Sequence, residues 1–128
     1  MFLANHQNAL LDALLIATHC KRKPYFLTRS DVFKTALLKV FFGFLQMIPV
    51  YRIRDGKNSL AGNTAIFERC AQLLGRGEAV LIFPEGNHCL KRRVRPLSKG
   101  FTRILFLALE SNPSMDIGIV PIGVNYAN

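Results

Sequence analysis

The order of apolar and polar positions along the chain predicts short strands that alternate with helices. The opening residues 1–5, MFLAN, are typical of a strand that ends in a polar loop. Residues 9–20 are apolar on most sides, which indicates a largely buried helix that Asn8 could cap. Residues 25–28, YFLT, are short, aromatic and apolar, and they favour a second strand.

The middle of the chain continues this alternation. Ser30 or Asp31 could cap a second helix that ends near residue 45. Residues 47–53, MIPVYRI, favour a strand, and the proline within it indicates a strand end, an edge strand or a bulge. The following RDGKN is typical of a turn, after which Ser59 is predicted to cap a third helix.

The last part of the chain predicts two more strands and one more helix. GRG at residues 75–77 is expected to end the third helix. EAVLIFPEG, residues 78–86, begins with a continuous apolar run, as a strand buried on both faces would. Residues 97–110 favour a fourth helix, and residues 116–124 favour a final strand.

Together these elements predict a single α/β domain over residues 1–128, in which helices flank a largely parallel sheet. Ligands of such sheets bind beyond the carboxyl ends of the strands. The polar motifs NHQN, YRIRD and PEGNH each follow a predicted strand, so we expect them to meet at one edge. Because a strand lies at each terminus, we also expect that the chain is cut from a longer one at both ends.

Composition narrows the possible partners. The net charge is +9, and half of the residues are hydrophobic, which argues against disorder and favours a polyanionic partner: nucleic acid, anionic lipid or a phosphorylated small molecule. The three cysteines are widely spaced and form no CxxC, which is typical of a reducing compartment. Two His-Cys pairs, at residues 19–20 and 88–89, are poor zinc candidates because adjacent residues rarely bind one ion together.

The longest apolar run is residues 35–50, TALLKVFFGFLQMIPV. It is shorter than the ~20 residues that a membrane-spanning helix needs. It could form a buried helix or lie at a membrane interface, and we expect the buried helix because many globular cores contain such segments. Four phenylalanines in or just before this run are expected to be core residues rather than the lining of an acyl groove: Phe33, Phe41, Phe42 and Phe44.

His6 and Asp12 are candidates for a proton-transfer pair. Six positions along a helix do not share one face, so their contact requires His6 to lie outside the helix that holds Asp12. The carboxylate could then accept the Nδ1–H of His6 and fix the tautomer in which Nε2 acts as a base. The alternative is a surface histidine beside an aspartate that the helix dipole favours.

Three further segments carry candidate chemistry. In LIFPEGNH, a buried strand leads into Glu85 and Gly86, and glycine lets the backbone approach a ligand closely. In IPVYR, Arg52 follows an apolar strand, and a guanidinium suits bidentate phosphate contacts. The last segment, IVPIGV, has a proline inside an apolar strand. Each segment alone is also compatible with an ordinary strand end.

In this order, the four segments resemble the glycerophosphate and lysophosphatidate acyltransferase family. That family carries a His-to-Asp motif, a block like Ile-Pro-Val-x-Arg, a Phe-Pro-Glu-Gly block and a Val-Pro block. Here they are matched by NHQNALLD, IPVYR, FPEG and Val120-Pro121, over residues 5–125. The resemblance implies an acyltransferase catalytic domain that acts in phospholipid biosynthesis.

The resemblance also implies residue roles. His6 is expected to remove the proton of the acceptor hydroxyl, with Asp12 as its orienting partner. Arg52, Glu85 and Gly86 match positions that bind the glycerol phosphate of the acceptor. A carboxylate suits a hydroxyl or an arginine better than a phosphate dianion, so we expect Glu85 to support the site rather than to contact phosphate.

The chain departs from the family pattern at two places. Five residues, QNALL, separate His6 from Asp12, where four are commonest. After FPEG the family often has a hydroxyl residue and an arginine, whereas this chain has Asn87 and a histidine. We expect Asn87 to take part in binding the acceptor. The basic run KRRVRPLSK, which ends in Lys99, could restore the positive charge at the acceptor site. Equally, it could be a loop that touches anionic lipid.

The expected function is therefore the transfer of a fatty acyl group from acyl-CoA or acyl-carrier protein to a hydroxyl of glycerol 3-phosphate or lysophosphatidate. No metal or resident cofactor is expected, and the partners are the thioester donor, the phosphorylated acceptor and the anionic cytoplasmic face of a membrane. One alternative is the same scaffold acting on another lipid acceptor. The other is a basic nucleic-acid-binding module, which predicts interleaved aromatics, whereas KRRVRPLSKGFTR offers only Phe101.

Overall fold

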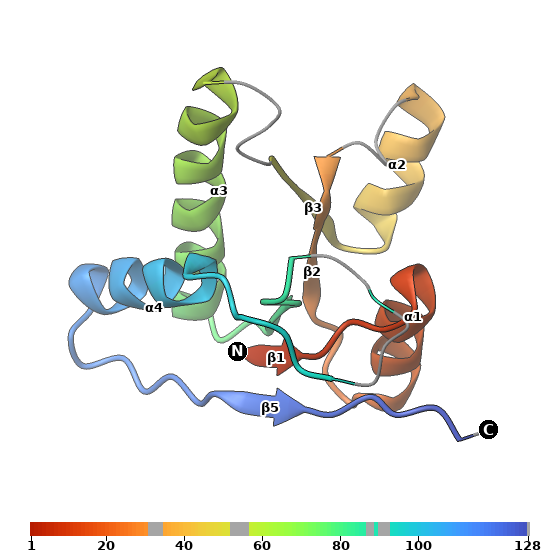
Figure 1. Cartoon of the computed structure of the whole chain (residues 1–128). Coiled ribbons are helices and arrows are strands. Elements are labelled where there is room, and N and C mark those ends of the chain that lie inside the picture. The colour runs from red at the N-terminus through yellow and green to blue at the C-terminus, as the bar shows by residue number, and fades with distance from the viewer. Residues whose placement is uncertain (31–34, 52–56, 87–88, 90–92, 128) are drawn as a thin grey trace.

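The computed structural model describes residues 1–30, 35–51, 57–86, 89 and 93–127 (Figure 1). Strands and helices alternate along these residues, as the sequence predicts. The elements are β1 (Phe2–Ala4), α1 (Ala9–His19), β2 (Tyr25–Arg29), α2 (Ala36–Phe44), β3 (Met47–Val50), α3 (Lys57–Gly75), β4 (Val80–Ile82), α4 (Gly100–Ser111) and β5 (Val120–Ile122).

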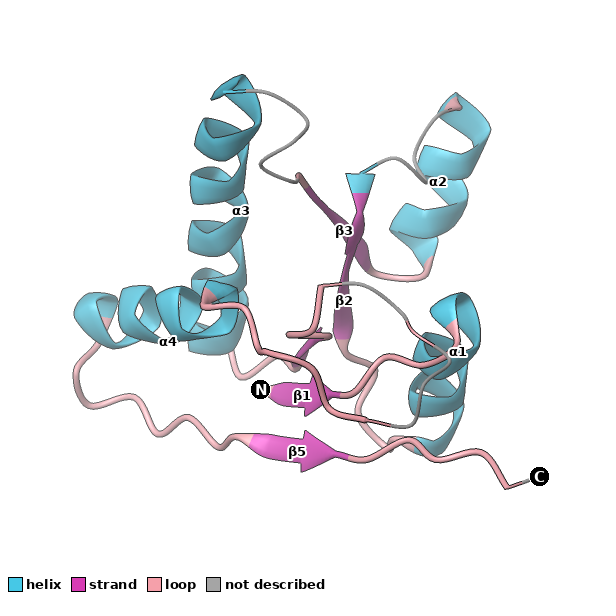
Figure 2. Ribbon diagram, in the orientation of Figure 1, coloured by secondary structure: helices cyan, strands magenta, loops and turns pink. Residues whose placement is uncertain are grey.

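The five strands form one sheet in the order β3-β2-β4-β1-β5, and every neighbouring pair is parallel. The predicted α/β class is confirmed. All five strands therefore end at the same edge of the sheet, and the loops that leave them begin there (Figure 2). β3 is an edge strand, which is where Pro49 can replace a backbone donor without breaking a ladder.

Two hydrophobic cores cover the two faces of the sheet. Alternate residues of the fully buried β4 serve different cores: Val80 and Ile82 pack with α3 and α4, and Leu81 packs with α1. In Figure 1 α3 and α4 lie on one side of the strands, and α1 and α2 lie on the other. This packing explains the continuous apolar run of β4, since a central parallel strand buries both of its faces.

Two predicted helix starts differ from the structure, and a third is in the predicted place without the predicted side-chain cap. Thr35 caps α2, because its hydroxyl accepts the N–H of Leu38 at 3.2 Å, so the cap is not Ser30, and Asp31 lies outside the described residues. Ser59 does not cap a helix, since α3 already begins at Lys57. Asn8 occupies the cap position of α1, but its side chain makes no capping hydrogen bond.

The prediction that residues 35–50 form a buried helix is wrong. No residue of α2 is buried, and Leu37, Val40 and Phe44 are 80%, 74% and 85% exposed. Phe41 is exposed too, so neither it nor Phe44 is a core residue.

The remaining predictions of buried apolar residues concern Phe42, Phe33 and α1. Phe42 is half-buried and packs against the core beside α1, whereas Phe33 lies outside the described residues. α1 is only partly buried, because Leu11 and Leu14 face solvent. No helix in the described part of the chain has the length and apolar character needed to span a bilayer.

Candidate active site

His6 and Asp12 are in contact at the end of β1. His6 lies in the loop between β1 and α1, and its Nδ1–H donates to Oδ2 of Asp12 at 3.0 Å. Asp12 sits in the first turn of α1, and a helical side chain leans back toward the helix N-terminus. The carboxylate therefore reaches the loop before the helix, and the pairing expected from the sequence is present.

The carboxylate of Asp12 is fully buried and accepts four hydrogen bonds. Its Oδ2 accepts the backbone N–H groups of Gln7 and Asn8, each at 2.8 Å, in addition to His6. Its Oδ1 accepts the hydroxyl of Tyr126. Burial alone would raise the pKa of a carboxyl group, but these hydrogen bonds, that of Tyr126 foremost, outweigh burial and lower the pKa of Asp12 below its usual value. The group is thus an anion at neutral pH, and it ties the loop before α1 to the first turn of that helix.

The loop after β4 packs against His6. The ring of Phe83 stacks on the imidazole, with ring centroids 4.1 Å apart and planes inclined by 23°. The backbone N–H of Cys89 donates to the carbonyl oxygen of His6 at 3.1 Å. The side chain of His6 is 16% exposed, so the ring is held on one face by an aromatic group while solvent still reaches it.

The Phe-Pro-Glu-Gly motif forms a tight turn directly beyond Phe83. The N–H of Gly86 donates to the carbonyl of Phe83 at 3.1 Å, and Gly86 has a φ of +72°, which favours glycine. Glu85 is almost fully buried and accepts the Nε–H of Arg95 at 2.9 Å. Glu85 thus holds an arginine, one of the two arrangements that its chemistry favoured.

Arg95 brings a positive charge to this turn. Its side chain is 21% exposed, and its Nη2 is buried without a hydrogen-bond partner among the described residues. The N–H of Ser98 donates to the carbonyl of Pro84 at 2.7 Å, which fixes the chain just before Lys99 against the same turn. Lys99 itself is exposed at the start of α4.

Two of the predicted site residues, Arg52 and Asn87, lie outside the described residues. Tyr51, the neighbour of Arg52, is described. Its backbone N–H donates to Oδ1 of Asn63 at 2.8 Å, and its carbonyl accepts the Nδ2–H of Asn63 at 2.6 Å. The end of β3 is thereby fixed to α3. Within the described ranges, no three His, Cys, Asp or Glu side chains are grouped to hold a metal ion.

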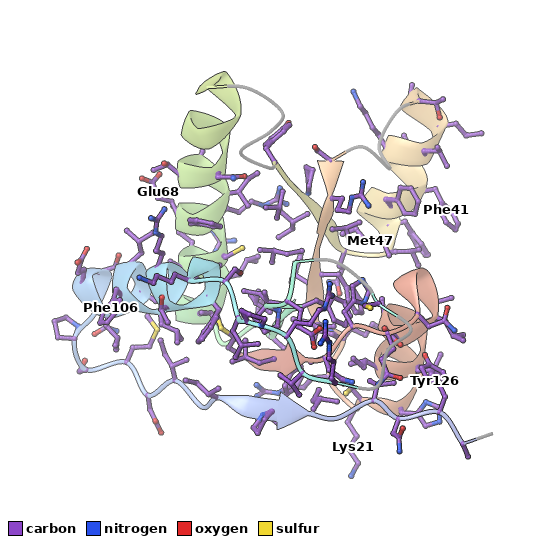
Figure 3. The ribbon with its side chains drawn as sticks, viewed as in Figure 1. Lys21, Phe41, Met47, Glu68, Phe106 and Tyr126 are labelled. Atoms are coloured by element: carbon purple, nitrogen blue, oxygen red, sulfur yellow. The ribbon has the colours of Figure 1, made fainter. Side chains whose placement is uncertain are left out.

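Sequence reasoning missed the contribution of the segment after β5. Val124 donates its N–H to Oδ1 of Asn5 at 2.6 Å and accepts the Nδ2–H of Asn5 at 2.8 Å, and the Tyr126 hydroxyl donates to Asp12. Figure 3 shows Tyr126 beside α1. These contacts join residues more than 110 positions apart in the sequence. No local spacing signals them, although the order of parallel strands would bring β5 to β1 once the sheet is known.

Comparison with known proteins gives one clear match. A family model described as Acyltransferase matches residues 1–125. A search of curated protein sequences gives no match. The matched region contains the His6–Asp12 pair and the Phe-Pro-Glu-Gly turn at one edge of a parallel sheet. The chain therefore belongs to the Acyltransferase family, the family of glycerol-phosphate and acylglycerol-phosphate O-acyltransferase enzymes.

Proposed function

We propose that the protein transfers a fatty acyl group from the thioester of acyl-CoA or acyl-carrier protein to a hydroxyl of glycerol 3-phosphate or lysophosphatidate. The observation that carries this proposal is the contact between His6 and the buried carboxylate of Asp12, beside the Phe-Pro-Glu-Gly turn. A histidine oriented by a carboxylate is the group that an alcohol needs in order to attack a thioester at neutral pH.

The reaction follows from the geometry of the pair. With Nδ1–H donated to Asp12, Nε2 of His6 takes the proton of the acceptor hydroxyl. The hydroxyl oxygen bonds to the thioester carbonyl carbon, and the carbon–sulfur bond then breaks. The leaving sulfur takes the proton that His6 holds, so the enzyme returns to its starting state. The anionic Asp12 stabilises the imidazolium that forms between these steps.

The phosphorylated acceptor is proposed on charge and position. Arg95 is fixed by Glu85 at the turn that touches His6, and its buried Nη2 is a donor without a partner among the described residues. The Arg95 side chain is 21% exposed, and a substrate phosphate oxygen suits a guanidinium as its acceptor. Arg52, Gly86, Asn87 and Lys99 are proposed to bind the same end of the acceptor. The anchoring of Tyr51 to α3 supports this, because it fixes the chain just before Arg52.

The decisive experiment is an assay of labelled acyl-CoA and acyl-carrier protein against glycerol 3-phosphate and lysophosphatidate. We expect transfer to at least one phosphorylated acceptor, and a loss of about 10²–10⁴-fold in His6→Ala, the usual contribution of a general base. His19→Ala is the matched control, since this exposed histidine at the end of α1 bonds only within its own helix among the contacts described. Near-normal turnover by folded His6→Ala would end the proposal.

Arg52→Ala separates acceptor binding from chemistry. We expect this change to raise the KM for a phosphorylated acceptor more than it lowers kcat, because a guanidinium contributes binding to phosphate. An unchanged KM would remove Arg52 from the site. Transfer to a lipid without phosphate would favour the other acceptors of this scaffold. Tight, salt-sensitive binding of single strands without any acyl transfer would instead favour a nucleic-acid-binding module.

We also propose that α2 lies on the surface of an anionic membrane at its cytoplasmic face. Leu37, Val40, Phe41 and Phe44 expose apolar side chains on one short helix, and the chain carries a net charge of +9. An apolar helix face on a basic protein is typical of interfacial binding. This would place the fatty acyl donor and the enzyme at the same surface.

Sedimentation with vesicles tests this placement. Phe44→Asp should weaken binding to vesicles that contain phosphatidylglycerol, because it puts a charge on the apolar face. Phe106→Asp is the matched control on α4, which lies on the opposite side of the sheet from α2 and its Phe41 (Figure 3). Equal binding by the two variants would contradict an interfacial role of α2.

A further inference from the structure

Tyr126 reaches the centre of the site from the other end of the chain. It follows β5, an edge strand that pairs with β1 in parallel register from Phe2↔Val120 to Ala4↔Ile122. Beyond β5, burial alternates: Val124 and Tyr126 are half-buried, whereas Gly123 and Asn125 are exposed. The segment therefore stays extended past the strand, and its inward-facing residues point toward α1.

Asn5 holds this segment in place. Its side-chain amide bonds both the N–H and the carbonyl of Val124, at 2.6 and 2.8 Å, so it extends the pairing of β1 and β5 by one more step. Asn5 directly precedes His6. The same residue of the chain thus fixes the position of the proposed base and of the segment that carries Tyr126.

The hydroxyl of Tyr126 completes the hydrogen bonding of Asp12. Oδ2 accepts from His6 and from two backbone N–H groups, and Tyr126 supplies the donor at Oδ1. With donors on both oxygens, the plane of the carboxylate is fixed. His6 and Tyr126 are the titratable groups among the described residues that act on Asp12, the other two donors being backbone groups.

Tyr126 remains a donor across the working pH range. Partial burial, the hydrogen bond to Asp12 and the negative charge of Asp12 together raise the pKa of Tyr126 to about 12. A hydroxyl that stays protonated draws electron density toward Oδ1. Oδ2 is then less basic, and the Nδ1 proton stays on the imidazole rather than moving to the carboxylate.

We propose that Tyr126 is a positioning residue of the acyltransferase, which holds Asp12 in the plane that aligns His6 and keeps Asp12 from taking the His6 proton. The proposal rests on the proposed role of His6 as the base. Tyr126 acts through Asp12. Loss of its hydroxyl should therefore change the alignment of His6 and the pH at which His6 titrates, and should leave acceptor binding nearly intact.

Tyr126→Phe tests the proposal, because it removes the hydroxyl and keeps the ring. We expect kcat to fall about tenfold, which is part of the ~10²–10⁴-fold that a general base supplies. The KM for the acceptor should change by less than about twofold, since the substrate-binding groups are untouched. Without the Tyr126 donor, Oδ2 binds the imidazolium more strongly, so the acidic limb of the kcat profile should move to higher pH.

Tyr25→Phe is the matched control. Tyr25 is half-buried and is the first residue of β2, so it lies where the parallel strands begin, whereas the site lies where they end. Tyr25→Phe removes a tyrosine hydroxyl there. We expect its kcat and pH profile to match the parent protein. A second variant, Asn5→Ala, should release the Val124 segment and give the same change in pH profile, and combining it with Tyr126→Phe should add little further loss.

A measurement on the ring of His6 separates this proposal from the proposed function. In a 2D NMR titration, Tyr126→Phe should raise the midpoint of the His6 imidazole signal, whatever the substrate. If His6→Ala abolishes transfer but Tyr126→Phe leaves kcat, the pH profile and the His6 midpoint unchanged, the role of Tyr126 is wrong and the proposed function stands. If His6→Ala retains transfer, the base assignment fails and the role of Tyr126 fails with it.

Discussion

Asp12→Asn is the substitution that tests most directly what the buried carboxylate contributes. The change keeps the size of the side chain and removes its charge. Asparagine can place its oxygen at the Oδ2 site and keep the three donors from His6, Gln7 and Asn8. Its amide nitrogen then faces the hydroxyl of Tyr126, which can rotate to accept. The variant is therefore expected to fold.

The cost in stability is set by the strength of four hydrogen bonds. Hydrogen bonds to a charged group contribute about 1.5–3 kcal/mol each, against about 0.5–1.5 kcal/mol for neutral pairs. The variant loses part of this difference at each donor, but it also avoids burying a charge. We expect a net loss of about 1–3 kcal/mol in the free energy of unfolding at pH 7.

The loss should depend on pH with a definite sign. The pKa of Asp12 is lowered in the folded protein, so its ionisation adds stability above the unfolded pKa of about 3.9, and that stability disappears as pH falls through the folded pKa. The difference in stability between the parent and Asp12→Asn should therefore be full at pH 7 and shrink below about pH 4. Urea denaturation at several pH values measures it.

Activity should fall much more than stability. Replacing the buried aspartate of a Ser-His-Asp triad by asparagine lowers kcat by about 10⁴-fold. In this protein the asparagine oxygen still accepts the Nδ1–H of His6, so the loss arises because the imidazolium formed in the reaction lacks a counter-charge. We expect about 10²–10⁴-fold here, in initial rates measured at saturating acyl donor. Asp116→Asn is the matched control, because it makes the same change at an exposed position away from the site.

Two outcomes would refute this reasoning. A folded Asp12→Asn protein that retains kcat within about threefold of the parent would mean that the carboxylate is not needed to orient or balance His6. A stability difference that stays the same from pH 7 down to pH 3 would mean that Asp12 contributes through shape rather than through charge.

Three further substitutions test the turn beside His6. Gly86→Ala should cost about 1–2 kcal/mol in unfolding free energy, because the φ of +72° strains a residue with a Cβ although no heavy atom of the described residues lies within 4 Å of that Cβ; a neutral result in denaturant titrations would count against the turn. Glu85→Gln should raise the KM for a phosphorylated acceptor severalfold with a smaller change in kcat, since it releases Arg95, and an effect on kcat alone would argue against an anion site there. Phe83→Leu should cost about 0.5–1.5 kcal/mol by removing the stacking on His6, and an unchanged melting temperature would show that the stacking adds little.

Much of the fold could be predicted from local patterns because those patterns reflect burial. The continuous apolar run of β4 predicted a strand covered on both faces, and Val80 and Leu81 indeed belong to opposite cores. The same logic failed for α2. An apolar helix signals that something covers it but not what, and the described part of this chain leaves Phe44 85% exposed. Composition alone cannot distinguish a core from a surface that meets a membrane.

The contacts of the site also differ in whether local sequence patterns predict them. The His6–Asp12 pair could be predicted because its members are close in sequence and a helix start lies between them. Tyr126 could not, since its contact with Asp12 joins positions 114 residues apart and depends on β5 lying next to β1. The Asn5 contact with Val124 is of the same kind. Such contacts follow from strand order, which a single sequence does not specify.

The five-residue spacing between His6 and Asp12 has a physical explanation in the start of α1. The carboxylate of Asp12 leans toward the helix N-terminus and is fixed by the N–H groups of Gln7 and Asn8, which lie directly before the first helical residue. Its position is thus set by the first turn of the helix and not by the number of residues before it. The loop has only to place His6 next to Oδ2, and the stacked Phe83 and the backbone of Cys89 hold it there. A spacing of four or five residues can therefore give the same contact, provided that the helix begins where the carboxylate can reach the N–H groups of the loop before it.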